Sequence, residues 1–187
     1  MTGVWWEYLA VFVASGVLCA VLTPMAIRLA VRSGALDHPA DHKSHKSPIP
    51  HLGGLAIVTA FTGAVVLAAI ARPPEGGLGV LLPLLLIATA LALVGLMDDL
   101  RELSPAWRVI AETGAAVVVW VLGSGVTVTG SDALNLILTV LWIVGITNAF
   151  NLLDNMDGLA AGLGAITCVS MFLVASANGQ FLVAALA

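Results

Sequence analysis

Charge is scarce in this chain. Of its 187 residues only 10% are charged, whereas 60% are hydrophobic. This composition excludes an ordinary soluble globular domain, in which about 25% of residues are charged. The apolar residues instead gather in runs of about 17 to 23, close to the roughly 20 residues that a helix needs to cross a bilayer. The sequence therefore predicts a membrane protein built from helices.

Other absences narrow the architecture further. Only two cysteines occur, Cys19 and Cys168, and both lie in apolar runs, so no disulfide or zinc framework is indicated. No stretch alternates apolar and polar residues for long enough to form the strands of a membrane barrel. Neither an internal repeat nor a low-complexity linker is present. Residues 1–187 are therefore expected to form a single integral membrane region.

Six apolar runs can be read as transmembrane helices: residues 5–27, 55–71, 78–97, 107–122, 134–150 and 159–177. A seventh run begins near Gln180. The fourth run is the weakest, because it is short and contains Glu112, for which the sequence indicates no partner. The connector "GSGVTVTGSD" that follows it is compatible with a brief extended hairpin. We predict an all-α, polytopic helical membrane protein with six transmembrane helices plus the start of a seventh.

The basic residues predict the orientation of these helices, because Lys and Arg near span ends favour the cytoplasmic side. All of them except Arg72 flank or occupy the first and third connections: Arg28, Arg32, Lys43, Lys46, Arg101 and Arg108. The N-terminus is therefore expected outside, and the first, third and fifth connections are expected at the cytoplasmic face of the plasma membrane.

The stretch "NAFNLLDNMDG" places polar residues where an apolar span would be expected to end. Its amides and carboxylates recur every third residue, along one side of a helix: Asn148, Asn151, Asp154 and Asp157. An unpaired carboxylate at the bilayer centre costs roughly 2.5 to 3.5 kcal/mol, and neighbouring carboxylates also repel each other. A divalent metal or a ligand with donor groups would relieve both costs. A helix end followed by an Asp/Asn/Gly turn is the simpler alternative.

A second acidic pair, Asp98 and Asp99, ends the third span. Adjacent side chains on a helix point about 100° apart, so one carboxylate can face a metal and the other a proton. Such oxygen donors suit Mg²⁺, with Mn²⁺ as the second option, because Mg²⁺ often binds one or two carboxylates together with substrate phosphates. Lys43, Lys46 and the nearby histidines of the first connection could neutralise phosphate oxygens. Solvated helix ends and the positive-inside rule are the simpler explanations of each stretch alone.

Three motifs occur in order: "DHPADHKSHKSPIPHLGG" in the first connection, "GLMDDL" at the end of the third span and "NAFNLLDNMDGLAAG" in the fifth connection. Together they resemble the polyprenyl-phosphate N-acetylhexosamine-1-phosphate transferases, a family that includes the phospho-N-acetylmuramoyl-pentapeptide translocase. The first motif is closer to the N-acetylglucosamine-1-phosphate branch, on the basis of Lys43, His45, Pro48 and Pro50.

The resemblance implies a membrane enzyme of the cytoplasmic face. It would transfer N-acetylhexosamine-1-phosphate from a UDP-sugar, such as UDP-N-acetylglucosamine, to a polyprenyl phosphate and release UMP. This would be the first lipid-linked step of a cell-envelope glycan such as lipopolysaccharide or teichoic acid. The implied partners are the two substrates and the membrane, with no nucleic acid and with a homodimer as an option. A direct attack and a covalent aspartyl intermediate both stay open.

The same resemblance assigns roles to individual residues. The catalytic and metal-binding set would be Asp98, Asp99 and Asp154, of which the adjacent pair deprotonates the lipid phosphate and handles Mg²⁺. The substrate-binding set would be Lys43, His45, Asn148, Asn151 and Asp157. One departure is His42, which stands where the family pattern has Arg and weakens an anion-binding role at that position.

Two expectations concern completeness and rival functions. The family is expected to have about ten or eleven helices, with a further metal-binding aspartate and a His-rich loop beyond the region covered here. Residues 1–187 are therefore expected to be the N-terminal part of a longer transferase and to be inactive alone. An ion-coupled transporter is the main alternative, but its polar groups should lie near the bilayer midplane and recur in repeats. An inactive membrane fragment is the other alternative.

Overall fold

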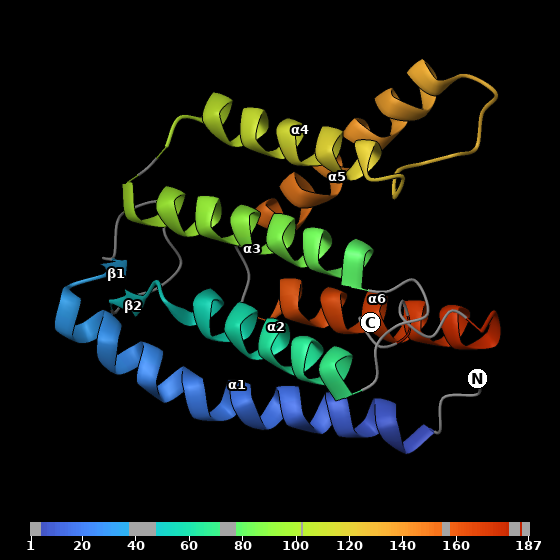
Figure 1. Cartoon of the computed structure of the whole chain (residues 1–187). Coiled ribbons are helices and arrows are strands. Elements are labelled where there is room, and N and C mark those ends of the chain that lie inside the picture. The colour runs from blue at the N-terminus through green and yellow to red at the C-terminus, as the bar shows by residue number, and fades with distance from the viewer. Residues whose placement is uncertain are drawn as a thin grey trace. The chain divides into compact units, whose positions relative to one another are not determined.

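The computed structural model describes residues 5–37, 48–71, 78–101, 103–154, 158–179 and 184. They form two compact units, residues 1–81 with 161–187 and residues 82–160. In chain order (Figure 1) the elements are α1 (Trp5–Ser33), β1 (Leu36–Asp37), β2 (Ile49–Pro50), α2 (Gly53–Ala71), α3 (Leu78–Arg101), α4 (Pro105–Val121), α5 (Asp132–Leu153) and α6 (Leu159–Ala177).

The all-helical prediction is confirmed, and each of the six predicted spans coincides with a helix. Five of these helices, all except α4, are long and apolar enough to cross a membrane. Several continue past the apolar run, as α1 does to Ser33, because backbone hydrogen bonding does not stop where the side chains become polar. The seventh run lies outside the described residues apart from Ala184, and the outside location of the N-terminus stays a prediction.

In the first unit, α1 and α2 run in opposite directions along each other (Figure 1). Small buried residues spaced by four, Ala56, Ala60 and Ala64, line α2, and such residues let helix backbones approach closely in membranes. The short hairpin between the helices pairs Leu36 with Pro50 and Asp37 with Ile49. The two helices are therefore held together by their packing and by the antiparallel pairing of β1 with β2.

The start of α1 also contacts α6 in this unit. The rings of Tyr8 and Phe172 meet edge to face, with centroids 5.6 Å apart and an interplanar angle of 76°, an arrangement that aromatic pairs favour. The first unit therefore contains α1, α2 and α6, although α2 ends at Ala71 and α6 begins only at Leu159.

The second unit contains α3 from Leu82 onward, α4 and α5. Pro105 occupies the first turn of α4, where its missing N–H costs nothing. At the other end, Gly123 adopts φ 73°, its N–H donates to the Trp120 carbonyl at 2.9 Å, and the Ser124 N–H donates to the Val119 carbonyl at 3.1 Å. This is a Schellman motif, which ends α4 and turns the chain toward α5.

The loop between α4 and α5 differs from the extended hairpin considered above. Residues 122–131, all of which the structure describes, form no strand. Instead, two buried side chains of α5 bond to the loop: Thr139 Oγ1 accepts from the Val126 N–H at 2.9 Å, and Asn135 Oδ1 accepts from the Thr129 N–H at 3.0 Å. Because side chains of a helix satisfy the loop backbone, no second strand is needed.

We call Gly125, Thr129, Asn135 and Thr139 the loop lock. Asn135 Nδ2 also donates to the Thr129 carbonyl at 3.1 Å, so this amide both accepts from and donates to one loop residue. Asn135 and Thr139 are only 6% and 2% exposed. A Cβ at Gly125 would lie 2.8 Å from Thr139 Oγ1, so the close approach of loop and helix requires glycine there.

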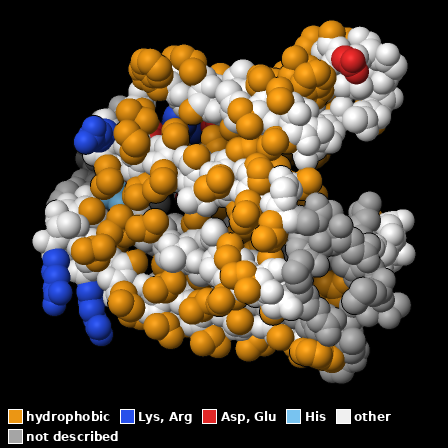
Figure 2. Space-filling model, in the orientation of Figure 1, with side chains coloured by type: hydrophobic (Ala, Val, Ile, Leu, Met, Phe, Trp, Pro, Cys, Tyr) orange, Lys and Arg blue, Asp and Glu red, His pale blue; other side chains and the backbone are white. Residues whose placement is uncertain are grey.

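Hydrophobic side chains cover much of the outer surface of the helices (Figure 2). Phe12 of α1, Leu86 of α3 and Leu141 of α5 are 76%, 70% and 64% exposed. Such extensive apolar exposure is unfavourable in water and suits contact with lipid tails. Arg28 and Arg32 lie toward the C-terminal end of α1, as expected at a membrane boundary.

Candidate functional site

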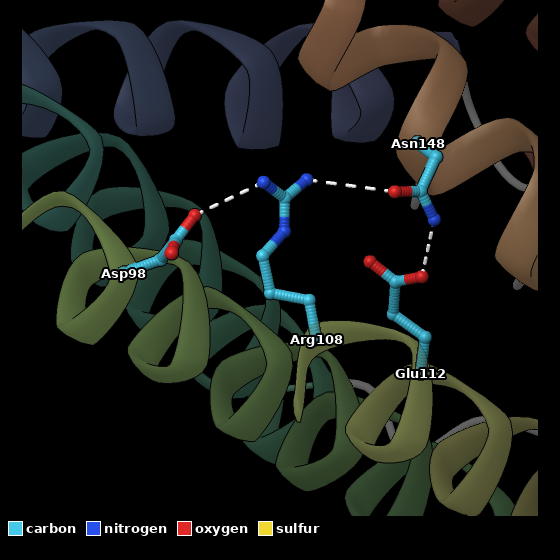
Figure 3. A network of polar contacts seen from close by, with 4 residues as sticks. All are labelled: Asp98, Arg108, Glu112 and Asn148. Carbon is cyan, nitrogen blue, oxygen red and sulfur yellow. Dashed lines mark hydrogen bonds and ion pairs between the residues drawn. The ribbon is translucent and has the colours of Figure 1, made fainter. Parts of the chain in front are cut away.

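Four polar side chains from three helices of the second unit meet at one place (Figure 3). We call this group the polar cluster: Asp98 of α3, Arg108 and Glu112 of α4, and Asn148 of α5. Asp98 lies in the last turn of α3, Arg108 in the first turns of α4, and Asn148 in the second half of α5. Because successive helices run in alternate directions, these segments lie at the same end of the unit (Figure 1).

An ion pair joins α3 to α4. Arg108 Nη1 donates to Asp98 Oδ2 at 3.0 Å, and the two side chains are 22% and 19% exposed. Hydrogen bonds between opposite charges are about twice as strong as those between neutral groups. In a partly buried position this pair is also screened less by salt than a surface pair would be.

The same guanidinium reaches α5. Arg108 Nη2 donates to Asn148 Oδ1 at 3.5 Å. With the Asn151 amide oriented so that its oxygen faces these donors, that oxygen also accepts from Arg108 Nη1 at 3.2 Å. Arg108 therefore bridges the "MDDL" motif and the "NAFNLLDN" motif, which lie about 50 residues apart in the sequence.

Glu112 completes the cluster from the buried side of α4. It is 4% exposed, and its Oε2 accepts a short hydrogen bond from Asn148 Nδ2. The second hydrogen of that amide nitrogen goes to the Val144 carbonyl at 2.9 Å. Asn148 thus uses both donors and its oxygen, and the partner that the sequence did not indicate for Glu112 is Asn148.

The predicted site residues fall into three groups. Asp98, Asn148 and Asn151 are brought together around Arg108. Asp99 and Asp154 have exposed side chains, and the backbone N–H of Asp154 donates to the Phe150 carbonyl at 3.2 Å, ending α5. Lys43, His45 and Asp157 lie outside the described residues.

The donor types at this end of the unit suit a hard cation. Carboxylate and amide oxygens are the ligands that Mg²⁺ prefers. Within the described ranges, however, no three Asp, Glu, His or Cys side chains converge so that they could hold a metal ion. A Mg²⁺ bound here would therefore rest on one or two carboxylates and on the phosphates of a ligand, as is common for this ion.

Two members of the polar cluster were not predicted as site residues. The sequence predicts Arg108 only as a marker of the cytoplasmic side and indicates no role for Glu112. The signal that could have found them is their spacing: four residues apart on a helix, they share one face, and a carboxylate inside an apolar run needs a polar partner from another helix.

Comparison with known proteins shows which family this chain resembles. The model of glycosyl transferase family 4 matches residues 81–187, which include the whole polar cluster. The chain is 32% identical over 184 residues to a probable undecaprenyl-phosphate N-acetylglucosaminyl 1-phosphate transferase of Bacillus subtilis, covering 94% of this chain and 50% of the relative.

Two mycobacterial proteins are also similar. A decaprenyl-phosphate N-acetylglucosaminephosphotransferase of Mycobacterium tuberculosis is 34% identical over 176 residues, covering 83% of this chain and 43% of the relative. A phospho-N-acetylmuramoyl-pentapeptide-transferase of Mycobacterium avium is 30% identical over 190 residues, covering 82% of this chain and 53% of the relative. The chain therefore spans about half the length of the curated relatives it matches.

Proposed function

The chain belongs to glycosyl transferase family 4, and on that premise we propose that it forms part of a phosphosugar transferase in a multi-pass membrane protein. The proposed donor is a UDP-N-acetylhexosamine, with UDP-N-acetylglucosamine favoured by the names of the relatives from Bacillus and Mycobacterium tuberculosis. The proposed acceptor is a polyprenyl phosphate, and the products are the lipid-linked sugar diphosphate and UMP. The reaction would begin a cell-envelope glycan.

One observation carries this proposal: Arg108 joins Asp98 and Asn148. Acceptors from both motifs hold the Arg108 guanidinium in position before any ligand binds. A guanidinium in a fixed position can bind phosphate oxygens, because the geometry of its donors matches theirs. Phosphoryl transfer depends mainly on positioning and on neutralising the charge that spreads over the oxygens. A transporter explains less well why both motifs converge on a cation near helix ends.

The transfer requires little covalent chemistry from the protein. An oxygen of the lipid phosphate forms a bond to the sugar-bearing phosphorus, and the bond from that phosphorus to the bridging oxygen breaks. The bridging oxygen leaves with UMP, while the bond between the sugar and its phosphate stays intact. Arg108 neutralises phosphate charge, Asp98 holds Arg108 in place, and Asp99 is the carboxylate proposed to take a proton from the lipid phosphate.

Mg²⁺ is the proposed cofactor, held by one or two of Asp98, Asp99 and Asp154, and when bound it supplies positive charge to the diphosphate. The site is proposed to face the cytoplasm, where UDP-sugars are made, in agreement with the distribution of basic residues. Lys43, His45 and Asp157 are proposed to complete the substrate contacts.

The test is a UMP-release assay on the protein purified from its complete gene, with UDP-N-acetylglucosamine, undecaprenyl phosphate and Mg²⁺. We expect UMP rather than UDP, and we expect Asp98→Asn to abolish more than about 99% of the rate, as loss of an electrostatic group commonly does. The matched control is Asp132→Asn, which neutralises the exposed acidic first residue of α5 at the opposite end of the second unit. Release of UDP, or an unchanged rate in Asp98→Asn, would overturn the proposal.

A further inference from the structure

Glu112 is a buried carboxylate in α4 that the proposed reaction does not use. It is 4% exposed and comes from the weakest of the predicted spans. A charge within a membrane helix is unfavourable and is usually retained for a function. The structure indicates this function through the contact that Glu112 makes with Asn148.

The hydrogen-bonding chemistry of Arg108, Asn148 and Glu112 fixes which group donates and which accepts at each contact. Arg is only a donor and an ionised Glu is only an acceptor, whereas the Asn amide has one end of each kind. With Glu112 and the Val144 carbonyl both accepting from Asn148 Nδ2, the oxygen of this amide has to face Arg108 (Figure 3). A flipped amide would place its donors against the donors of Arg108 and its oxygen against Glu112.

The position of Asn148 also separates two charges on α4. Arg108 and Glu112 lie four residues apart, a spacing at which opposite charges on a helix can pair directly. Such a pair would draw the guanidinium along α4 and away from Asp98. In the structure Asn148 stands between them (Figure 3), and Arg108 instead bonds to Asp98 at 3.0 Å.

We propose that Glu112 is a positioning residue, which orients the Asn148 amide and thereby holds the Arg108 guanidinium at Asp98. This inference rests on the proposed function, because the position of Arg108 matters for phosphate transfer. It requires an acceptor oxygen at residue 112 rather than a negative charge. Glutamine can supply that oxygen and alanine cannot.

The first test compares Glu112→Ala with Glu112→Gln in the UMP-release assay, with rates divided by the amount of folded protein. We expect Glu112→Ala to lower kcat about 10- to 100-fold at a KM within about threefold of the original, because misplacing a catalytic group by an ångström has effects of this size. Glu112→Gln should stay within about threefold in kcat. An unchanged Glu112→Ala, or equal losses in both variants, would overturn the proposal.

A second pair of variants covers the case in which Glu112→Ala does not fold. Asn148→Asp alone places two carboxylates against each other and should be strongly impaired. Adding Glu112→Gln restores the hydrogen bond with the roles exchanged, because residue 112 now donates and residue 148 accepts. The double variant should therefore be at least about tenfold faster than Asn148→Asp alone. If the double variant is no better than Asn148→Asp, the proposed contact does not position Arg108.

These outcomes separate the two proposals. Failure of the proposed function appears as absence of UMP release in the original protein. Failure of the inference appears as normal kinetics in Glu112→Ala while the original protein is active. A double-mutant cycle tests the contact itself without any substrate. Thermal unfolding temperatures are measured for the original protein, Glu112→Ala, Asn148→Ala and the double variant, and residues in contact should give losses of stability that do not add.

Discussion

The two ends of α5 use polar side chains for different purposes. At its start, the loop lock is neutral, and its side chains bond to the backbone of the neighbouring loop. Toward its end, the polar cluster is charged, and its side chains bond to other side chains across three helices. Almost fully buried groups occur at both places: Asn135 and Thr139 near the start of α5, and Glu112 of α4 beside its later part.

The difference separates a stabilising role from a functional one. Neutral groups that satisfy a loop backbone remove the desolvation penalty of buried N–H and C=O groups. A charged cluster is a poorer way to stabilise a fold, because desolvation offsets much of the attraction between buried charges. Substitutions in the loop lock should therefore lower stability and leave kcat unchanged, whereas substitutions in the polar cluster should lower kcat.

The largest effect is expected for Arg108→Ala. It removes the cation that bridges Asp98 and Asn148, and loss of one such electrostatic group lowers kcat roughly 10²- to 10³-fold. UMP release under saturating UDP-N-acetylglucosamine measures the loss. Arg101→Ala is the matched control, because this exposed arginine ends α3 outside the polar cluster. Equal losses in the two variants would show that only the overall positive charge matters.

An intermediate effect is expected for Asn135→Ala in the loop lock. The substitution leaves the Thr129 N–H and carbonyl, which are partly buried, without their side-chain partner. Unpaired polar groups that are shielded from water cost about 1 to 3 kcal/mol. The midpoint of thermal unfolding in detergent should fall, while kcat per folded molecule should stay unchanged. A normal melting temperature combined with a reduced kcat would contradict the contrast between the two ends of α5.

The smallest effect is expected at Thr139, where two substitutions separate shape from hydrogen bonding. Thr139→Val keeps the shape but leaves the Val126 N–H unpaired, and we expect a loss of about 1 kcal/mol. Thr139→Ser keeps the hydroxyl and loses one methyl group, so its loss should stay below about 1 kcal/mol. Thermal unfolding of both variants tests this order, and a larger loss in Thr139→Ser would assign the stabilisation to packing.

The sequence predicted the helices well because hydrophobicity along one chain is enough to locate them. The expected spans 78–97 and 134–150 became α3 and α5, with ends displaced by a few residues. The convergence of Asp98 and Asn148 at one end of the unit followed from the alternation of helix directions. Both conclusions depend on the order and length of the apolar runs.

The contacts within the site could not be predicted in the same way. They depend on the rotation of each helix about its own axis, which side-chain packing between helices determines. Glu112 could therefore be recognised as unusual, but nothing in the sequence selected Asn148 rather than another polar residue as its partner. The loop after α4 was misjudged for a similar reason, since Asn135 and Thr139 resemble ordinary residues of an apolar run until α5 is placed against the loop.

The pairing of Glu112 with Asn148 has a consequence for how the protein is made. α4 has 17 residues and carries two charged side chains, Arg108 and Glu112, so its transfer into lipid by itself is unfavourable. Its partner lies 36 residues further along the chain and leaves the ribosome later. We therefore expect α4 to reach its final position only after α5 has been synthesised, when Asn148 can meet Glu112.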